Sequence, residues 1–219
     1  MSIEQAKWRE PTATLTRHSI LLDIGERVIV ATVFASFAYR MLFHAGVTAG
    51  VQTALLVMAE TLPFIYIVLR APSVSLSQRP WDWAFGIMGT IMPLFVTPAV
   101  NLAPMVPGSV CVAIMLVGMI LQVAAKLILG RSFGIIPANR GVRVVGPYRI
   151  IRHPMYAGYT MTHIGFLLAM PSPINAALYT LAFSFQVSRI FREERVLLAD
   201  PGYRAFAERV RYRLVPGLF

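Results

Sequence analysis

Charged residues are scarce in this sequence, and long apolar runs take their place. Only 14% of the 219 residues are charged, whereas 57% are hydrophobic. A soluble domain carries roughly 25% charged residues, so the deficit indicates a lipid environment. The length suits one compact bundle rather than two separate domains.

Acidic side chains are the scarcer of the two signs, with 10 Asp and Glu against 20 Lys and Arg and a formal net charge of +10. In a soluble protein this excess would suggest nucleic-acid binding. Here the basic residues flank apolar runs, which fits an anionic membrane surface better. We therefore expect membrane lipids, and no nucleic acid, as partners.

Cysteine is nearly absent, because Cys111 is the only one and lies inside an apolar run. A single cysteine excludes an internal disulfide and a multi-cysteine metal site. The histidines are scattered along the chain, so we expect no metal centre. Residues 1–24 are too polar and too mixed in charge for a signal peptide, and we interpret them as a cytoplasmic N-terminal segment.

Apolar stretches of the length that crosses a membrane, about 20 residues, recur along the chain. The first of them are Val28–Val47, Val51–Leu69, Trp83–Leu102 and Val110–Leu129. A longer apolar block, Met155–Phe191, is interrupted at 171–173 by the sequence PSP. Proline ends helices, so we predict a hairpin of two helices at 155–170 and 174–191. The predicted fold is an all-α integral membrane bundle of six transmembrane helices, or five if the hairpin counts as one element.

Lysine and arginine are distributed unevenly among the connections, and this sets the expected orientation. The connections AGVTAG, NLAPMVPGS and PSP hold neither residue type. Basic residues gather instead before the first span, between the second and third, in the loop at 130–153 and in the tail. We predict a multi-pass protein with both termini and the loop in the cytoplasm.

The polar loop at 130–153 runs into the motif GPYRIIRHPMYAGY. Pro154 suits the first position of a helix, and the free N–H groups of such a helix attract a carboxylate or phosphate. Arg152 and His153 add donors at the same place, and Tyr156 offers an aromatic face. The plain alternative is an interfacial anchor, because Arg and Tyr both favour the headgroup layer. Anchoring does not require His, Pro and Gly in this order.

The tail after the last span carries the acidic pair Glu193 and Glu194 among many arginines. Arg189 precedes Glu193 by one helical turn, so an ion pair is expected for one of the two glutamates. Further along, apolar residues recur at helical spacing with arginines on the other face. They are Tyr203, Phe206 and Val210. This pattern predicts a basic amphipathic helix that lies on the cytoplasmic leaflet or crosses the loop as a lid.

The motif Arg-His-Pro-x-Tyr-x-Gly, with LGRSFG before it and EERVLL and GYRAFAERVRYRLVPGLF after it, resembles the isoprenylcysteine carboxyl methyltransferase family. It also resembles the wider group that contains membrane phospholipid methyltransferases. The similarity covers 126–219 and marks 130–219 as a catalytic region behind the membrane helices of 25–129. It implies an integral membrane enzyme that uses S-adenosylmethionine without a Rossmann domain, in line with the lack of a G-x-G-x-x-G fingerprint.

The resemblance also implies roles for individual residues. It assigns cofactor binding to Tyr148, His153, Pro154, Tyr156, Gly158 and Glu194, and catalysis to Glu193 and Arg152. We expect Glu194 to face the cofactor and Glu193 to lie nearer the acceptor, with the reverse order as the alternative. At Gly158 the missing side chain would let a ligand approach closely. Tyr156 would face the sulfonium as a cation–π partner.

The acceptor stays open at this level. A carboxylate or a thiolate is already nucleophilic, whereas an ammonium headgroup must first lose a proton to a base. The first hypothesis is a methyltransferase resembling the carboxyl O-methylating enzymes, with a lipid-linked or small amphiphilic acceptor. The second is a phospholipid N-methyltransferase of the ethanolamine type. The third, from a different class, is a non-catalytic transporter or sensor subunit.

Ionisable residues inside predicted spans invite a functional hypothesis. Glu60 lies midway along the second span and Arg40 near the outer end of the first, so we predict a structural pair between these neighbouring helices. A role for Glu60 at the substrate headgroup is the alternative. His163 lies on nearly the same helix face as Tyr156. We expect it to be hydrogen-bonded inside the bundle, with a place at the substrate tunnel as the alternative.

Overall fold

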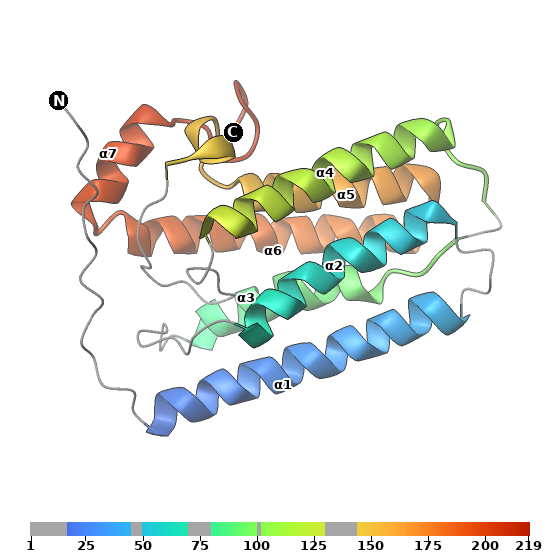
Figure 1. Ribbon diagram of the computed structural model, residues 1–219, viewed down its shortest axis with the longest axis horizontal. Coiled ribbons are helices and arrows are strands. Elements are labelled where there is room, and N and C mark those ends of the chain that lie inside the picture. The colour runs from blue at the N-terminus through green and yellow to red at the C-terminus, as the bar shows by residue number, and fades with distance from the viewer. Residues whose placement is uncertain (1–16, 45–49, 70–79, 100–101, 130–143) are drawn as a thin grey trace.

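A computed structural model describes residues 17–44, 50–69, 80–99, 102–129 and 144–219. Every regular element in these ranges is helical (Figure 1). The main helices are α1 (Arg17–Tyr39), α2 (Val51–Leu69), α3 (Pro80–Ile91), α4 (Gly108–Leu129), α5 (Pro154–Ala169), α6 (Pro173–Leu197) and α7 (Pro201–Arg209). A π-helical turn (Arg40–His44) extends α1. One 3-10 turn, Met92–Phe95, follows α3, and another, Gly146–Arg149, precedes α5.

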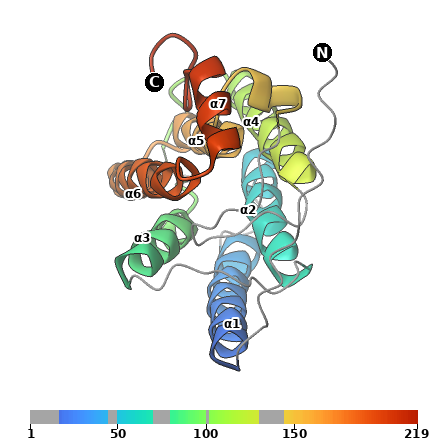
Figure 2. The same ribbon diagram turned by 90° about the vertical axis from the view of Figure 1, so that its left-hand side faces the viewer.

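The long helices run back and forth along one axis of the molecule (Figure 1). The first residues of α1, α3 and α5 lie at the same end of the bundle as α7, and α2, α4 and α6 begin at the opposite end. Seen from the α7 end, α4, α5 and α6 form one side, and α1 lies on the far side of α2 and α3 (Figure 2). This path brings the turn before α5, the end of α6 and all of α7 together.

Helices α4 and α5 form the closest contact in the bundle, at a pair of glycines. A Cβ atom added to Gly158 would lie 2.6 Å from the backbone oxygen of Gly118 and 2.7 Å from the backbone nitrogen of Gln122. Glycines allow two helix backbones to approach in this way, as small residues do in membrane helix pairs. Next to this contact, Met115 and Phe166 are completely buried in the main apolar core.

The hairpin predicted at 155–170 and 174–191 is confirmed as α5 and α6. Helix α6 continues to Leu197, so the acidic pair lies on the last turns of this helix rather than in a separate tail. The amphipathic helix is confirmed as α7. Its apolar side chains pack onto the protein against Val144 and Leu197, an arrangement that agrees with a lid rather than with a helix whose apolar face enters the leaflet.

The prediction of a continuous helix over Trp83–Leu102 is wrong in its second half. Helix α3 ends at Ile91, and the chain passes through a 3-10 turn that contains Pro93. Proline has no N–H to donate and disrupts the helix interior. The backbone beyond this break has side-chain partners, since the Asn175 amide accepts from Thr97 N at 3.2 Å and donates to Thr97 O at 2.8 Å.

The predicted pair of Arg40 with Glu60 is also wrong. Arg40 donates to the backbone oxygen of Leu94 and lies over the ring of Phe95, where it satisfies a carbonyl of the broken helix. Glu60 instead lies 2.9 Å from Nε2 of His163 on α5. The short loop makes α1 and α2 neighbours, but Glu60 faces α5. The expected hydrogen bond of His163 inside the bundle is confirmed.

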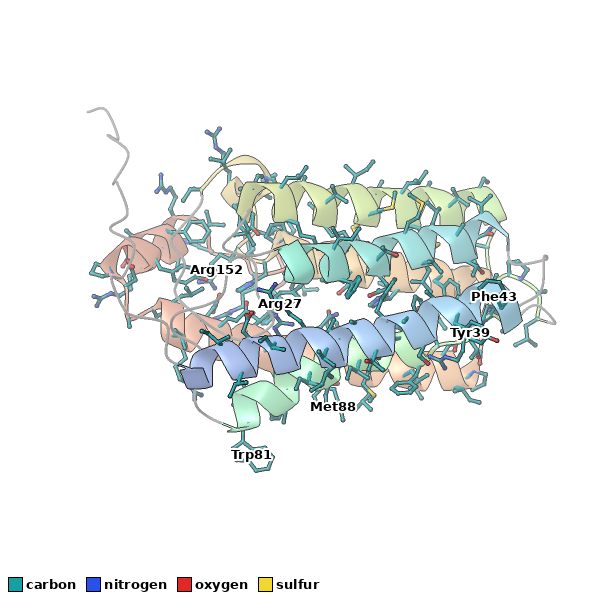
Figure 3. The ribbon with its side chains drawn as sticks, turned by 60° about the horizontal axis from the view of Figure 1, so that its bottom comes forward. Arg27, Tyr39, Phe43, Trp81, Met88 and Arg152 are labelled. Carbon is teal, nitrogen blue, oxygen red and sulfur yellow. The ribbon has the colours of Figure 1, made fainter. Side chains whose placement is uncertain are left out.

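Helix α4 is the one helix in the described ranges that is long and apolar enough to cross a membrane. Only 28% of its most apolar window is buried within the protein, so most of its apolar surface faces outward. Exposed aromatic residues mark both ends of the outer surface: Trp81 projects away from the bundle where α3 begins, and Tyr39 and Phe43 lie at the far end of α1 (Figure 3). Met88 is exposed between these ends.

Substitution of Gly158 by alanine should lower the stability of the bundle, because the added methyl group would press on the backbone of α4. Overpacking of this kind costs about 1–3 kcal/mol. Thermal unfolding of the full chain in detergent measures the effect. Gly25→Ala in α1 is the matched control, since nothing lies within 4 Å of its added Cβ. An equal melting temperature for both variants would contradict the close packing.

Candidate functional site

The turn that precedes α5 is shaped by its own glycine and proline residues. Gly146 adopts a positive φ of 58°, which side chains disfavour, and Pro147 follows it in the 3-10 turn. The residue before a proline avoids the helical region, and His153 accordingly has φ −125° and ψ 59°. Helix α5 then begins at Pro154, as predicted. His153 is therefore the N-cap residue of α5.

The chain that follows α7 runs alongside this turn and is hydrogen-bonded to it. The backbone N–H groups of Arg152 and His153 donate to the backbone oxygens of Tyr212 and Arg213, each at 2.9 Å. At the other end of α7, the side chain of Asp200 caps the helix by accepting from the N–H groups of Gly202 and Tyr203. The position of α7 over the turn is thus set at both of its ends.

Glu194 is surrounded by three basic side chains. Its Oε1 lies 3.2 Å from Nε2 of His153 and 3.1 Å from Nε of Arg152, and its Oε2 accepts from Nε of Arg213 at 2.8 Å. Burial alone would raise the pKa of this carboxyl, but the bonds from His153 and Arg213 and the charge of Arg152 outweigh burial and hold the pKa of Glu194 below its ordinary value. Glu194 is therefore ionised at neutral pH.

Glu193 has different partners and is more open. Its Oε1 accepts from the Tyr156 hydroxyl at 2.6 Å and from Nε of Arg189 at 3.1 Å. The helical ion pair expected between Arg189 and Glu193 is confirmed. His153 Nδ1 lies 3.9 Å from Glu193 Oε2, too far for a hydrogen bond. The side chain of Glu193 is 18% exposed against 4% for Glu194, so Glu193 is the glutamate that remains accessible.

A cavity lies between the turn, the end of α6 and α7. Together with the open space at its mouth it amounts to about 560 Å³. Its walls combine polar groups with apolar and aromatic groups. They are Leu129, Tyr148, Arg152, His153, Met155, Tyr156, Glu193, Leu197, Tyr203 and Phe206.

Two polar groups in this wall make no hydrogen bond within the described part of the chain. Arg152 Nε is buried and makes no hydrogen bond, although it lies at ion-pairing distance from Glu194. The hydroxyl of Tyr203 is buried without a partner as well. Burial raises the pKa of Tyr148 and of Tyr203, so both hydroxyls stay protonated. Buried donors without acceptors are uncommon in proteins, and here they border a cavity.

The structure brings most of the residues chosen from the sequence to one place. Tyr148, Arg152, His153, Tyr156 and Glu193 all line the cavity. Pro154 and Glu194 stand behind this wall, one as the first residue of α5 and the other as the ionic partner of Arg152 and His153.

Gly158 differs from expectation, because the space in front of it is filled by the backbone of α4 and not open to a ligand. Sequence reasoning also missed two sets of residues. Tyr203 and Phe206 line the cavity, although their helical spacing had marked only an amphipathic helix. Arg213 pairs with Glu194, and no pattern distinguishes it from the other arginines of the tail.

The lowered pKa of Glu194 predicts acid-sensitive folding. A carboxyl with a lower pKa in the folded state stabilises the fold above its ordinary pKa of about 4.5, and this stabilisation is lost as the pH falls through the folded-state value. Glu194→Gln should therefore be less stable than the wild type at neutral pH. It should also lose less stability than the wild type on acidification.

Thermal unfolding in detergent over a series of pH values measures this difference. Glu208→Gln, on the exposed side of α7, is the control and should follow the wild-type curve. Parallel curves for Glu194→Gln and the wild type would contradict a stabilising carboxylate at this position.

Comparison with known families agrees with this geometry. Residues 108–200 match the family model described as phospholipid methyltransferase. The matched range contains α4, α5, α6 and both glutamates, and it ends where α7 begins. No curated protein matches the chain. The match confirms the resemblance of residues 108–200 to the wider group that contains membrane phospholipid methyltransferases, and it indicates a membrane methyltransferase.

Proposed function

We propose that this protein is a multi-pass membrane methyltransferase that uses S-adenosylmethionine and methylates a lipid-linked or small amphiphilic acceptor. One observation carries the proposal. The Arg-His-Pro turn, Glu193 and α7 come from separate parts of the chain and line one cavity. This is the arrangement that the sequence resemblance implied, and the matched family contains methyltransferases.

The outer surface of the bundle supports the membrane part of the proposal. Large apolar side chains are exposed along the whole length of α1, α4 and α6, among them Leu21, Val28, Ile120, Leu127, Ile174 and Phe183. A soluble monomer rarely exposes apolar patches on this scale. The exposed Trp81, Tyr39 and Phe43 occupy opposite ends of the bundle (Figure 3), as aromatic residues do at the two faces of a bilayer.

The orientation follows from the arginines. Arg149, Arg195, Arg204, Arg209 and Arg211 are all exposed at the end of the bundle that holds the cavity. Cytoplasmic segments are enriched in Lys and Arg, so this end with its site faces the cytoplasm. Residues 130–219 then form the catalytic region and 25–129 the membrane helices that precede it. The predicted N-terminal segment at 1–24 falls mostly outside the described residues.

The residues of the cavity fit S-adenosylmethionine in charge and shape. Arg152, whose Nε makes an ion pair with Glu194 but no hydrogen bond, suits the carboxylate of the methionine part, with His153 beside it. Glu193 suits the ammonium group or the ribose hydroxyls. Tyr148, Tyr203 and Phe206 offer flat surfaces and hydroxyl donors for the adenine ring.

Catalysis in this site would be mainly alignment. When bound, S-adenosylmethionine supplies a methyl group on a positively charged sulfur, which an in-line nucleophile can take. Tyr156 presents its ring to this charge, and its hydroxyl is held by Glu193. Helix α7 lines the cavity with Tyr203 and Phe206, which would limit the access of water to the reacting atoms. Glu194 acts behind them as a positioning residue for Arg152 and His153.

The family match favours a second candidate for the acceptor. The matched model is that of phospholipid methyltransferases, and an ethanolamine-type headgroup would be methylated on nitrogen. This alternative shares the cofactor site with the first and differs only in the group that receives the methyl. A non-catalytic transporter or sensor would not need a site for the methyl donor.

Binding of S-adenosylhomocysteine to the full chain in detergent tests the proposal. We expect saturable binding by calorimetry, and a loss of about tenfold or more in affinity for Glu193→Gln and for Arg152→Gln, because each removes a charged hydrogen-bond partner worth about 1.5–3 kcal/mol. Glu208→Gln is the matched control and should bind as the wild type does. A folded wild type that binds neither S-adenosylhomocysteine nor S-adenosylmethionine would rule out the methyltransferase.

A further inference from the structure

A second cavity lies inside the helical bundle, next to the first. It encloses about 600 Å³ of empty space, counted with its open part. Side chains from α1, α2, α3, α5 and α6 form its walls. Met155 and Tyr156 line both cavities, so the two spaces share these side chains as a common wall.

Charged groups reinforce the common wall. Arg189 lines the second cavity and Glu193 lines the first, and they meet at Glu193 Oε1, which also accepts from the Tyr156 hydroxyl. In a one-step displacement the nucleophile contacts the methyl carbon directly, so transfer between the two cavities would take place beside Met155 and Tyr156, where the two spaces adjoin. The second cavity is therefore in the right place for the acceptor.

The polar centre of the second cavity is the pair Glu60 and His163. Both residues are nearly buried, with 8% and 6% exposure, and their Oε1 and Nε2 atoms are 2.9 Å apart. The His163 ring is stacked on Tyr179, with centroids 4.5 Å apart, and lies nearly parallel to Tyr159. Its orientation is thus fixed by packing as well as by Glu60. Glu60 lies on α2, outside the matched residues 108–200.

Other titratable groups surround the pair on three helices. They are Lys126 on α4, Tyr156 and Tyr159 on α5, and Tyr179 and Arg189 on α6. Lys126 Nζ bonds to Gln122 at 2.9 Å and lies 4.7 Å from the centre of the Tyr159 ring. Among the described residues, no Lys or Arg lies at ion-pairing distance from Glu60. The walls from α1 and α3 contribute only Val30, Phe34, Gly89 and Thr90.

We propose that Glu60 and His163 bind the nucleophilic group of the acceptor and remove its proton before methyl transfer. The acceptor is then a protic nucleophile, such as an amine or a thiol, and not a carboxylate. This inference rests on the proposed function, because it assigns the acceptor side of the same reaction. It agrees with the alternative offered by the sequence, in which Glu60 acts at the headgroup of the substrate.

The proton balance is simple. The step requires a carboxylate at Glu60 that accepts a hydrogen bond from Nε2 of His163, with Nδ1 of the same ring taking the proton from the acceptor. The lone pair left on the acceptor atom forms the new bond to the methyl carbon. The electron pair of the broken carbon–sulfur bond stays on the sulfur of the donor. The imidazolium that forms is stabilised by Glu60, as a carboxylate stabilises histidine in other proton transfers.

The charge of the cavity argues against a carboxylate acceptor. Glu60 is bonded to His163 but has no Lys or Arg at ion-pairing distance among the described residues. In a low-dielectric space it would repel a second carboxylate, and Arg189, the cation in the wall, is already paired with Glu193. Aromatic rings from Phe34, Phe64, Tyr156 and Tyr159 line the same space. A carboxylate among aromatic faces suits a neutral or cationic nucleophile.

The test uses three probes that differ only in their headgroup: dodecylamine, dodecanethiol and dodecanoic acid. The full chain in detergent is supplied with labelled S-adenosylmethionine, and transfer is measured over a range of pH. The wild type should methylate the amine or the thiol and leave the acid unmodified. Glu60→Gln and His163→Gln should each lose about 100-fold or more in kcat at neutral pH, the usual contribution of a general base. Their affinity for S-adenosylhomocysteine should be unchanged.

The pH profile separates proton removal from a structural role. The loss in both variants should shrink as the pH rises, because solvent then removes the proton from the acceptor. Thr61→Val, one residue from Glu60 and with a hydroxyl that donates to Val57 O of its own helix, is the control and should keep wild-type turnover. If Glu60→Gln does not fold, His163→Gln decides the question.

Several results would overturn the inference. They are wild-type turnover in a folded variant, a loss that is the same at every pH, transfer to dodecanoic acid, and transfer to none of the probes. In each case binding of S-adenosylhomocysteine would leave the proposed function standing. A wild type that binds no S-adenosylhomocysteine removes the proposed function, and this inference with it.

Discussion

A buried carboxylate holds the candidate site together. Glu194, at the end of α6, pairs with Arg152 and His153 from the turn before α5 and with Arg213 from the segment after α7. Without this carboxylate, the guanidinium groups of Arg152 and Arg213 would lose the counter-charge that they share, which is unfavourable above all for the buried Arg152. Because Glu194 satisfies these groups, the neighbouring Glu193 is left to face the cavity and to join Tyr156 and Arg189 in the wall between the two cavities.

Much of the helical framework could be predicted from local signals. Apolar runs and prolines located α4, the hairpin of α5 and α6, and the start of α5 at Pro154. The motif before α5 and the acidic pair identified five of the cavity residues, since they are adjacent in sequence to a helix start or a helix end. These features depend on short-range rules of proline geometry and helical spacing, which a sequence displays directly.

What could not be predicted depends on which face of a helix meets which neighbour. Glu60 was assigned to the nearest helix in sequence, yet it faces His163 across the bundle. Gly158 was expected to make room for a ligand, and it makes room for α4. The end of α3 at Ile91 was not predicted. The backbone groups beyond it are hydrogen-bonded by the side chains of Asn175 and Arg40, which are distant in sequence. Tertiary contacts of this kind leave no local pattern.

The shortness of α3 has a consequence for the surrounding lipid. With 12 residues, this helix is about 18 Å long, while the hydrocarbon core of a bilayer is about 30 Å thick. The clamp of Asn175 on Thr97 keeps the chain beyond the break from extending the helix. In the proposed membrane placement, the hydrocarbon core on this flank would therefore meet the 3-10 turn and the non-helical backbone after it as well as a regular helix, so the backbone groups there depend on side-chain partners such as Asn175 in place of water.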